Sequence, residues 1–308
     1  MLNFLLDIAP DKSQLLLTIK LAGILREKKQ EVYYTYTSNP AFTPVLYDKG
    51  ISNCVLYPDD FRWLKPDLTL LDCRHAAHAS LYWQLAIDYI FISMQLPDQK
   101  NIQDKDISIL YLPPTPYLSS GSGPRLETLT KRLQDIKKDK ERNIIVGLLG
   151  KGNKNSKILE DFYRVIKGSS IRNPRYQFIL LTDIPNVYQS SELPDNMELF
   201  RTLNLNTILP LCDLALTDSH SDAWLDCTFA QIPVLKYSPK DMINITPMKL
   251  EQQIEYALQN KTTLTQKAKE LCDFFERKNR EINKIADMLI ERAGRNRYNS
   301  CRLRPHTY

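Results

Sequence analysis

Acidic side chains stand directly after apolar segments that predict strands, where they could act as general acids or bases. Asp11 follows the first such segment, residues 2–9, and Asp72 ends the segment 67–71. A carboxylate within reach of a hydroxyl can accept its proton. Asp11 also has a structural interpretation, because capping and the helix dipole favour acids at the start of a helix. Both interpretations stay open.

Histidine is scarce, with four residues in the whole chain, and two of them follow Asp72 closely. His75, three residues after Asp72, is a further candidate base, because imidazole titrates near neutral pH. A single histidine beside an apolar helix more often has a structural role. We therefore expect structural roles for His75 and His78.

Glycine and lysine gather in the turn after another predicted strand, residues 143–149. Gly150, Lys151 and Gly152 stand there, just before a predicted helix that begins at Ser156. Backbone N–H groups at a helix N-terminus attract phosphate, and a lysine adds positive charge. The turn matches neither the P-loop nor the dinucleotide-binding glycine pattern. On these residues alone, an ordinary strand–helix turn is an equal alternative.

Residues 209–241, LPLCDLALTDSHSDAWLDCTFAQIPVLKYSPKD, predict four consecutive elements. These are a buried strand (211–217), a polar turn (218–222), a helix (223–230) and a second buried strand (233–237). Ser219 and His220 stand in the turn, and Asp226 stands in the helix. In open α/β sheets, ligands bind beyond the carboxyl ends of the strands, where this turn lies.

The same segment resembles the donor-binding signature of the nucleotide-sugar glycosyltransferases, a family that includes macrolide-type, glycopeptide and plant small-molecule enzymes. The family pattern begins L-P-x-C-D, continues through a hydrophobic strand and a polar turn to an L-E pair in a helix, and ends G-V-P. The matching residues here are Leu209, Pro210, Cys212, Asp213, Leu225, Asp226 and Pro233. About thirty residues carry this resemblance.

The resemblance implies roles for the acids on the donor side. Asp226 stands in place of the glutamate that holds the ribose hydroxyls. Asp241 resembles the aspartate that contacts sugar hydroxyls, one residue short of register, and Met242 replaces the glutamine beside it. A capping acid is an equal alternative for Asp241.

The phosphate side of the signature departs from the family. Asp218 replaces a histidine near the donor diphosphate, and a negative charge there is unfavourable. His220 and Ser219 could supply hydrogen-bond donors instead. The turn at 150–152 resembles the short glycine loop that opens the second domain of the family.

In the first domain the resemblance implies a catalytic base. Asp11 lies in D-K-S-Q-L-L, where many members have histidine and the glycopeptide branch has aspartate. Asp72 stands where plant members keep the acid that orients their catalytic histidine. The implied catalytic pair is therefore Asp11 and Asp72.

The fold class that we expect is α/β, with two Rossmann-like domains facing a cleft, and the resemblance implies that this is the GT-B architecture. Strands alternate with helices in both halves. Prolines 113, 114 and 116 and the segment SSGSGP separate the halves. The expected parts are an acceptor-side domain (1–118), a linker and helix (119–142), a nucleotide-sugar-binding domain (143–263), and a C-terminal helix with a basic tail (264–308).

The implied activity is transfer of a sugar from a nucleoside diphosphate sugar to an acceptor hydroxyl, inverting and without a metal or cofactor. The partners are a nucleotide sugar and an acceptor that the sequence does not identify. One alternative is an inactive GT-B subunit or binding module for a glycosylation partner. Another is a sugar-nucleotide hydrolase or epimerase.

Composition narrows the class of protein further. The chain is 43% hydrophobic, enough for buried cores. Its six cysteines form no C-x-x-C pair, which argues against zinc or redox motifs. No apolar run reaches the ~20 residues of a membrane span, and the N-terminus does not resemble a signal peptide because Asp7 interrupts it. We therefore expect a cytoplasmic protein.

The net charge of +5 resides in the C-terminal tail, which carries five arginines and no acid: Arg292, Arg295, Arg297, Arg302 and Arg304. We expect a solvated or disordered terminus. The alternative is contact through residues 292–304 with a protein partner, an anionic acceptor or a membrane surface. Nucleic acid is not expected, because no basic–aromatic face appears elsewhere.

Overall fold

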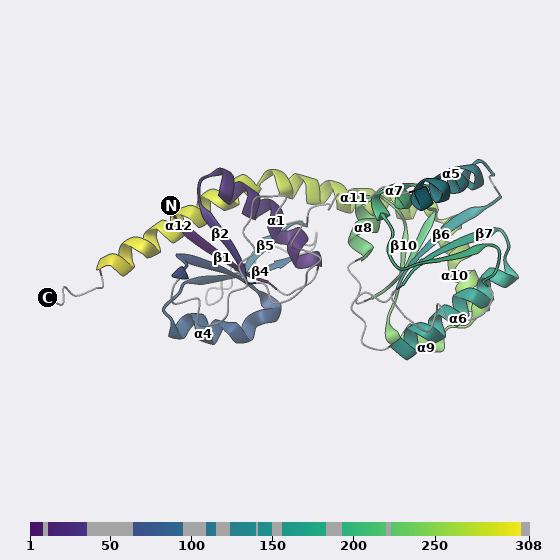
Figure 1. The fold of residues 1–308 in the computed structure, drawn as a ribbon, viewed down its shortest axis with the longest axis horizontal. Helices are drawn as coiled ribbons and strands as arrows, with labels where there is room; N and C mark the ends of the chain where they lie inside the picture. The colour runs from purple at the N-terminus through teal and green to yellow at the C-terminus, as the bar shows by residue number, and fades with distance from the viewer. Residues whose placement is uncertain are drawn as a thin grey trace. The chain divides into compact units, whose positions relative to one another are not determined.

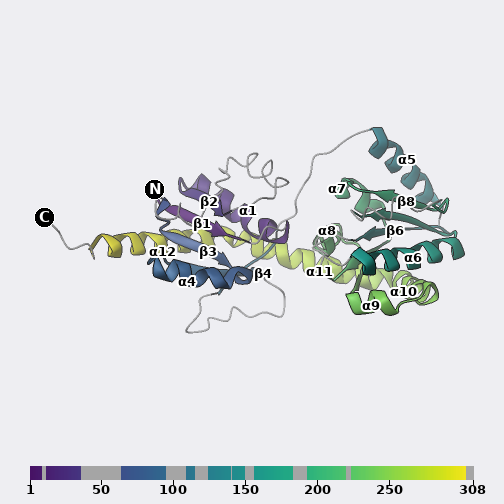
Figure 2. The same cartoon turned by 60° about the horizontal axis from the view of Figure 1, so that its bottom comes forward.

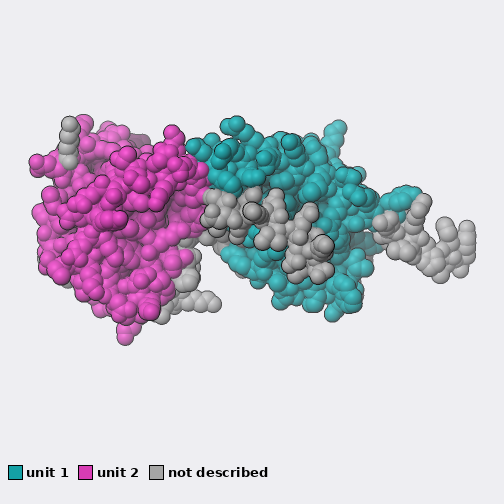
Figure 3. All heavy atoms as spheres, turned by 180° about the vertical axis from the view of Figure 1, so that it is seen from behind, with its two compact units in different colours: residues 1–115, 273–308 teal, residues 116–272 magenta. Residues whose placement is uncertain are grey.

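The computed structural model divides into two compact units, Met1–Thr115 with Asp273–Tyr308, and Pro116–Cys272 (Figure 3). Within them it describes residues 1–8, 12–35, 64–94, 109–114, 124–139, 141–149, 156–182, 193–219 and 223–302. The chain returns to the first unit within helix α11 (Lys261–Arg280). The first unit is therefore built from both ends of the chain.

The first unit contains a five-stranded parallel sheet in the order β2-β1-β3-β4-β5 (Figures 1 and 2). Every residue of β3 is buried, as expected for a parallel strand with both faces covered. The elements are β1 (Asn3–Asp7), α1 (Lys12–Glu27), β2 (Glu31–Thr35), β3 (Leu68–Asp72), η2 (Cys73–His78), α4 (Ala79–Gln84), β4 (Tyr89–Met94) and β5 (Ile109–Leu112).

Helix α12 (Ile282–Arg302) completes this unit by packing against α1 and β3 (Figure 2). Its apolar residues recur every three or four positions, so they form one stripe. The fully buried members are Ile282, Ala286, Leu289 and Ala293. No helix among the described residues has both the length and the apolar character that a bilayer span requires.

The arginine tail is expected to be solvated or disordered. Disorder is wrong for residues 292–302, which lie in α12, whereas the Arg295 side chain is solvated, at 71% exposed. Arg292 donates to both carboxylate oxygens of Asp88, at 2.8 and 2.9 Å. Arg297 donates to the carbonyl of Met1 at 2.5 Å. These partners stand some 200 or more residues earlier in the chain, so charge counted locally along the tail could not reveal them.

The second unit also contains a five-stranded parallel sheet, in the order β10-β9-β6-β7-β8. Its elements are α5 (Pro124–Lys138), β6 (Asn143–Leu148), α6 (Ser156–Arg172), β7 (Tyr176–Leu181), β8 (Met197–Phe200), α7 (Leu205–Ile208), η4 (Leu209–Leu211), β9 (Leu214–Asp218), α8 (Ala223–Phe229), β10 (Val234–Tyr237), α9 (Pro239–Asn244) and α10 (Pro247–Gln259).

Helices cover both faces of this second sheet, because alternate residues of each strand point to opposite faces. Ile145 of β6 packs in a core with side chains from α6, α9 and α10. Its neighbours Ile144 and Val146 pack in a second core with side chains from α5, α7 and α8. The sheet is therefore the middle layer of an α/β/α sandwich.

Each sheet has a point where the strand order reverses. In the first unit β1 has β2 on one side and β3 on the other. In the second, β6 stands between β7 and β9. The carboxyl ends of strands on either side of such a point leave a crevice where α/β proteins bind ligands. Functional side chains are therefore expected after β1 and β3, and after β6 and β9.

Candidate active site

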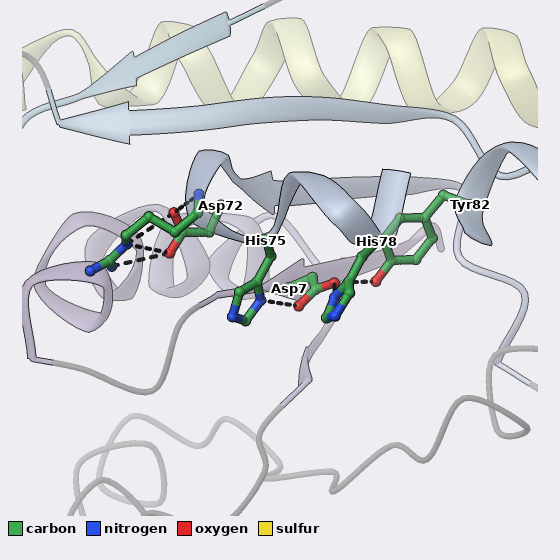
Figure 4. Close-up of polar contacts among 6 residues, drawn as sticks. Asp7, Asp72, His75, His78 and Tyr82 are labelled. Carbon is green, nitrogen blue, oxygen red and sulfur yellow. Dashed lines mark hydrogen bonds and ion pairs between the residues drawn. The ribbon is translucent and has the colours of Figure 1, made fainter. Parts of the chain in front are cut away.

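One buried carboxylate at the carboxyl end of β1 collects three polar partners from the helical segment that follows β3. Asp7 is 2% exposed. Its Oδ1 lies 2.9 Å from Nδ1 of His75, and its Oδ2 lies 2.7 Å from Nδ1 of His78. The Tyr82 hydroxyl donates to the same Oδ2 at 2.6 Å. Figure 4 shows the two imidazoles and the phenol converging on Asp7.

Local structure explains the convergence. Residues Cys73–His78 form a 3₁₀ segment with a kink at His75, where the backbone angles (φ −98°, ψ 24°) leave the helical region. The rings of His75 and His78 lie beside one another, with centroids 4.8 Å apart. Asp7 pairs with Leu71 across the parallel register of β1 and β3, so the 3₁₀ segment begins beside the end of β1.

The electrostatics of the cluster favour a charged Asp7 with donors around it, since a buried carboxylate needs hydrogen bonds to remain charged. Burial and the charge of Asp7 raise the pKa of Tyr82 well above its ordinary value, so its hydroxyl stays a donor. An imidazole that donates from Nδ1 carries its basic lone pair on Nε2. Within the described residues neither Nε2 has a hydrogen-bond partner, and the side chains are 25% and 51% exposed.

Asp72 ends β3 next to this cluster but binds a different partner. It is 1% exposed, and its Oδ1 accepts the backbone N–H of Arg74 at 2.9 Å, which caps the 3₁₀ segment. Its Oδ2 accepts from the guanidinium of Arg74 at 3.1 Å. The acid in contact with both histidines is therefore Asp7. Asp11 lies outside the described residues.

On the second unit, two of the expected donor-side residues, Ser219 and Asp226, lie after the end of β9, and the unfavourable Asp218 ends that strand. Asp218 is the last residue of β9 and is 1% exposed. Ser219 is exposed, and its backbone N–H donates to the carbonyl of Tyr237 at 2.8 Å. Asp226 lies in the first turn of α8 and is 9% exposed. Four further expected residues lie outside the described part of the chain: Gly150, Lys151, Gly152 and His220.

Asp241 takes part in a capping box at the start of α9. Its Oδ2 accepts from the backbone N–H and the hydroxyl of Ser238, at 2.9 and 2.6 Å. The Ser238 hydroxyl in turn accepts from the backbone N–H of Asp241. Hydrogen bonds from Ser238 lower the pKa of the Asp241 carboxyl. Asp241 also lines an open hollow beside the side chains of Lys236 and Lys240.

The first half of the 209–241 signature lies at the opposite, amino-terminal edge of the sheet. Asp213 precedes β9, and its Oδ2 accepts the backbone N–H of Ile144 at 2.8 Å. Its Oδ1 lies 2.5 Å from Nζ of Lys261. Cys212 is buried, and burial raises the pKa of its thiol to about 12. Asp213 therefore ties the start of β9 to the start of β6, at the edge opposite the carboxyl ends where α/β proteins bind ligands.

Solved structures with this architecture cover almost the whole chain. The glycosyltransferase SnogD from Streptomyces nogalater matches with a TM-score of 0.63 at 15% identity, over 95% of this chain and 99% of that chain. Spinosyn rhamnosyltransferase SpnG complexed with spinosyn aglycone gives 0.66 at 12%, over 92% and 100%. Glycosyltransferase VinC in complex with dTDP gives 0.59 at 12%, over 95% and 100%.

The chain has the GT-B fold. Neither protein-family models nor curated protein sequences give a match, so this assignment rests on structure. The two parallel sheets confirm the fold class that the alternation of strands and helices predicts.

Two members of the candidate site on this GT-B scaffold, Asp7 and Tyr82, are not predicted from the sequence. The available signal was the aspartate that closes the apolar strand NFLLD, at a carboxyl end where α/β proteins place functional groups. The sequence suggests His75 as a base but does not suggest its partner. That partner is 68 residues away and is brought close by strand pairing.

Proposed function

We propose that this protein is a glycosyltransferase that moves a sugar from a nucleoside diphosphate sugar to an acceptor hydroxyl, with inversion and without a metal at the diphosphate. The near-full-length likeness to GT-B glycosyltransferases carries the proposal. Asp7 with its histidines supports it, at the point where the strand order of the first sheet reverses. The buried acid Asp226 supports it at the corresponding point of the second sheet. The matched structures include SpnG complexed with thymidine diphosphate.

The catalytic base in this proposal is an imidazole held by Asp7. The acceptor oxygen attacks the anomeric carbon, its proton passes to Nε2 of His78 or His75, and the bond from carbon to the diphosphate oxygen breaks. Asp7 fixes the tautomer and stabilises the imidazolium that forms. This assignment replaces Asp11, which lies outside the described residues. His78 is the more exposed imidazole and therefore the first choice.

The donor in this proposal binds beyond β6 and β9. Asp226 accepts hydrogen bonds from the ribose hydroxyls, for which a carboxylate is well suited. Ser219, His220 and the turn at 150–152 face the diphosphate, and Asp241 contacts the sugar. Backbone N–H groups and the dipole at a helix N-terminus stabilise the departing phosphate.

The deciding experiment is calorimetric titration with dTDP, UDP and GDP, each with and without Mg²⁺. We expect one nucleotide to bind independently of the metal. Asp226→Asn keeps the shape of the side chain and removes its charge, so it should weaken that nucleotide at least tenfold. Asp135→Asn, an exposed acid on α5, is the matched control and should bind like the wild type.

A second function is favoured by one observation, the burial of Asp218 at the end of β9. A negative charge there opposes a diphosphate. The chain would then be an inactive GT-B subunit that serves a glycosylation partner. Failure of all three nucleotides to bind a correctly folded protein would support this second function and contradict the transferase.

A further inference from the structure

We propose that Asp7, His75 and His78 form a binding site for a single divalent transition-metal ion, with Zn²⁺ as the best fit. One carboxylate oxygen and two imidazole nitrogens, one ligand atom from each residue, lie within 4.8 Å of one another. Both Nδ1 atoms point at the same carboxylate, at 2.9 and 2.7 Å (Figure 4).

The ligand set selects the class of metal. Two imidazoles and one carboxylate suit Zn²⁺ and its neighbours, whereas Mg²⁺ and Ca²⁺ prefer oxygen ligands alone. Three protein ligands leave a fourth position for water or another small ligand. The absence of C-x-x-C pairs argues against a cysteine zinc motif only, and none of the ligands proposed here is a cysteine.

The scaffold holds the ligands in place before any metal arrives. Asp7 lies on a buried strand, and the two histidines lie on the segment Cys73–His78, which Asp72 caps and which is kinked at His75. Each imidazole already hydrogen-bonds Asp7. The Tyr82 hydroxyl donates to Oδ2 of Asp7. Such an outer hydrogen bond orients a ligating carboxylate, and its loss commonly weakens metal binding tenfold or more.

Metal binding and the base role use different nitrogens of the same rings. In the free cluster each Nδ1–H faces Asp7 and each Nε2 carries the lone pair. A neutral imidazole that moves its proton from Nδ1 to Nε2 offers Nδ1 to the metal and loses its basic Nε2. The proposed metal binding does not depend on the proposed glycosyltransferase function. Inhibition of sugar transfer by bound Zn²⁺ would follow from it, and that expectation rests on the proposed function.

The test is titration of the full-length protein with ZnCl₂, and with MgCl₂ as the comparison. We expect one Zn²⁺ per chain and at least tenfold weaker binding of Mg²⁺.

His78→Gln changes a half-exposed side chain, so folding should survive, and Zn²⁺ affinity should fall at least tenfold. Tyr82→Phe should weaken it about tenfold. His306→Ala is the matched control and should leave the affinity unchanged. Zn²⁺ binding that is equal in wild type and in the His75→Gln/His78→Gln double variant would overturn the site.

Cobalt supplies a second readout that needs no activity. Co²⁺ bound by nitrogen and oxygen should give visible d–d bands that disappear in the double variant. A sulfur-to-cobalt charge-transfer band would instead place the ion on a cysteine such as Cys73 and overturn the assignment. Burial raises the pKa of the Cys73 thiol, which disfavours that ligand. Nucleotide binding reports the proposed function separately, so failure of one proposal is distinguishable from failure of the other.

Discussion

At the scale of single residues, the carboxylate of Asp7 determines what two histidines can do. A histidine beside an apolar helix is expected to be structural, and the sequence offers no partner nearby. The structure places both imidazoles on one buried acid, which fixes Nδ1 as the protonated nitrogen if the rings are neutral. Asp72, the acid expected to orient a base, binds Arg74. Asp7, which orients the imidazoles, is level with Leu71 in the sheet, and Asp72, which caps the 3₁₀ segment, stands one position further along β3.

Asp7→Asn should lower kcat about 10²–10⁴-fold, the range that a positioned acid–base group contributes. An asparagine amide that donates toward Nδ1 would move the imidazole proton to Nε2 and remove the basic lone pair. The measurement is release of nucleoside diphosphate from the donor that calorimetry selects. Donor affinity should not change. The double variant Asp7→Asn/His78→Ala should be little worse than the single variant, because the residues act as a unit. Wild-type kcat in Asp7→Asn would contradict the assigned base.

At the scale of elements, local patterns predict most strands and helices but not those with weak patterns. The strands β5 and β8 have four residues each, and neither is predicted from the sequence. β10 is equally short, but it is predicted as part of the 209–241 segment. The strand expected from Leu211 begins at Leu214, because residues 209–211 form a 3₁₀ turn that contains Pro210. The single C-terminal helix expected within 264–308 is two helices, α11 and α12, which meet at Glu281.

The central strand β6 depends on a glycine. A Cβ at Gly147 would collide with Cδ2 of Leu180 on the neighbouring strand β7, and Leu180 is completely buried. Gly147→Ala should therefore destabilise the protein by about 1–3 kcal/mol through overpacking. Urea unfolding followed by circular dichroism measures this.

A matched substitution in a helix should have the opposite sign. A Cβ added at Gly23 in α1 would have nothing within 4 Å, so Gly23→Ala should stabilise by about 0.5–1 kcal/mol through helix propensity. The second-site variant Gly147→Ala/Leu180→Val should recover part of the loss, because valine is shorter. A free energy of unfolding for Gly147→Ala equal to that of the wild type would show that the sheet accommodates a Cβ beside Leu180, contrary to this prediction.

At the scale of the whole molecule, the last helix belongs to the fold of the first 115 residues. The stripe of α12 supplies buried side chains to α1 and β3, and Arg292 and Asn296 both donate to Asp88. Lys20 and Asn279 add two more hydrogen bonds, to the carbonyls of Asn279 and Pro114. The hydrophobic core of the first unit is therefore complete only once α12 has been synthesised and has packed against α1 and β3.

Leu289→Ala should destabilise the first unit by about 2–5 kcal/mol, because it opens a cavity beneath α12. Amide hydrogen exchange should accelerate in β3 and α1, more than 200 residues away in sequence, and should stay unchanged in β7. Met288→Ala changes the adjacent, half-exposed side chain and should cost less than about 0.5 kcal/mol. Unaltered exchange in β3 after Leu289→Ala would show that α12 is not part of that core.

The amino-acid sequence by itself determined the alternation of buried strands and amphipathic helices, and with it the two parallel sheets. It could do so because hydrophobic periodicity is local. Only the tertiary structure decided that Asp7 serves His75 and His78, 68 and 71 residues away, and that Asp88 binds Arg292, 204 residues away. Those pairings depend on which strands are neighbours and where their ends meet. Strand order and register are properties of the packed sheet, and no local pattern along the chain records them.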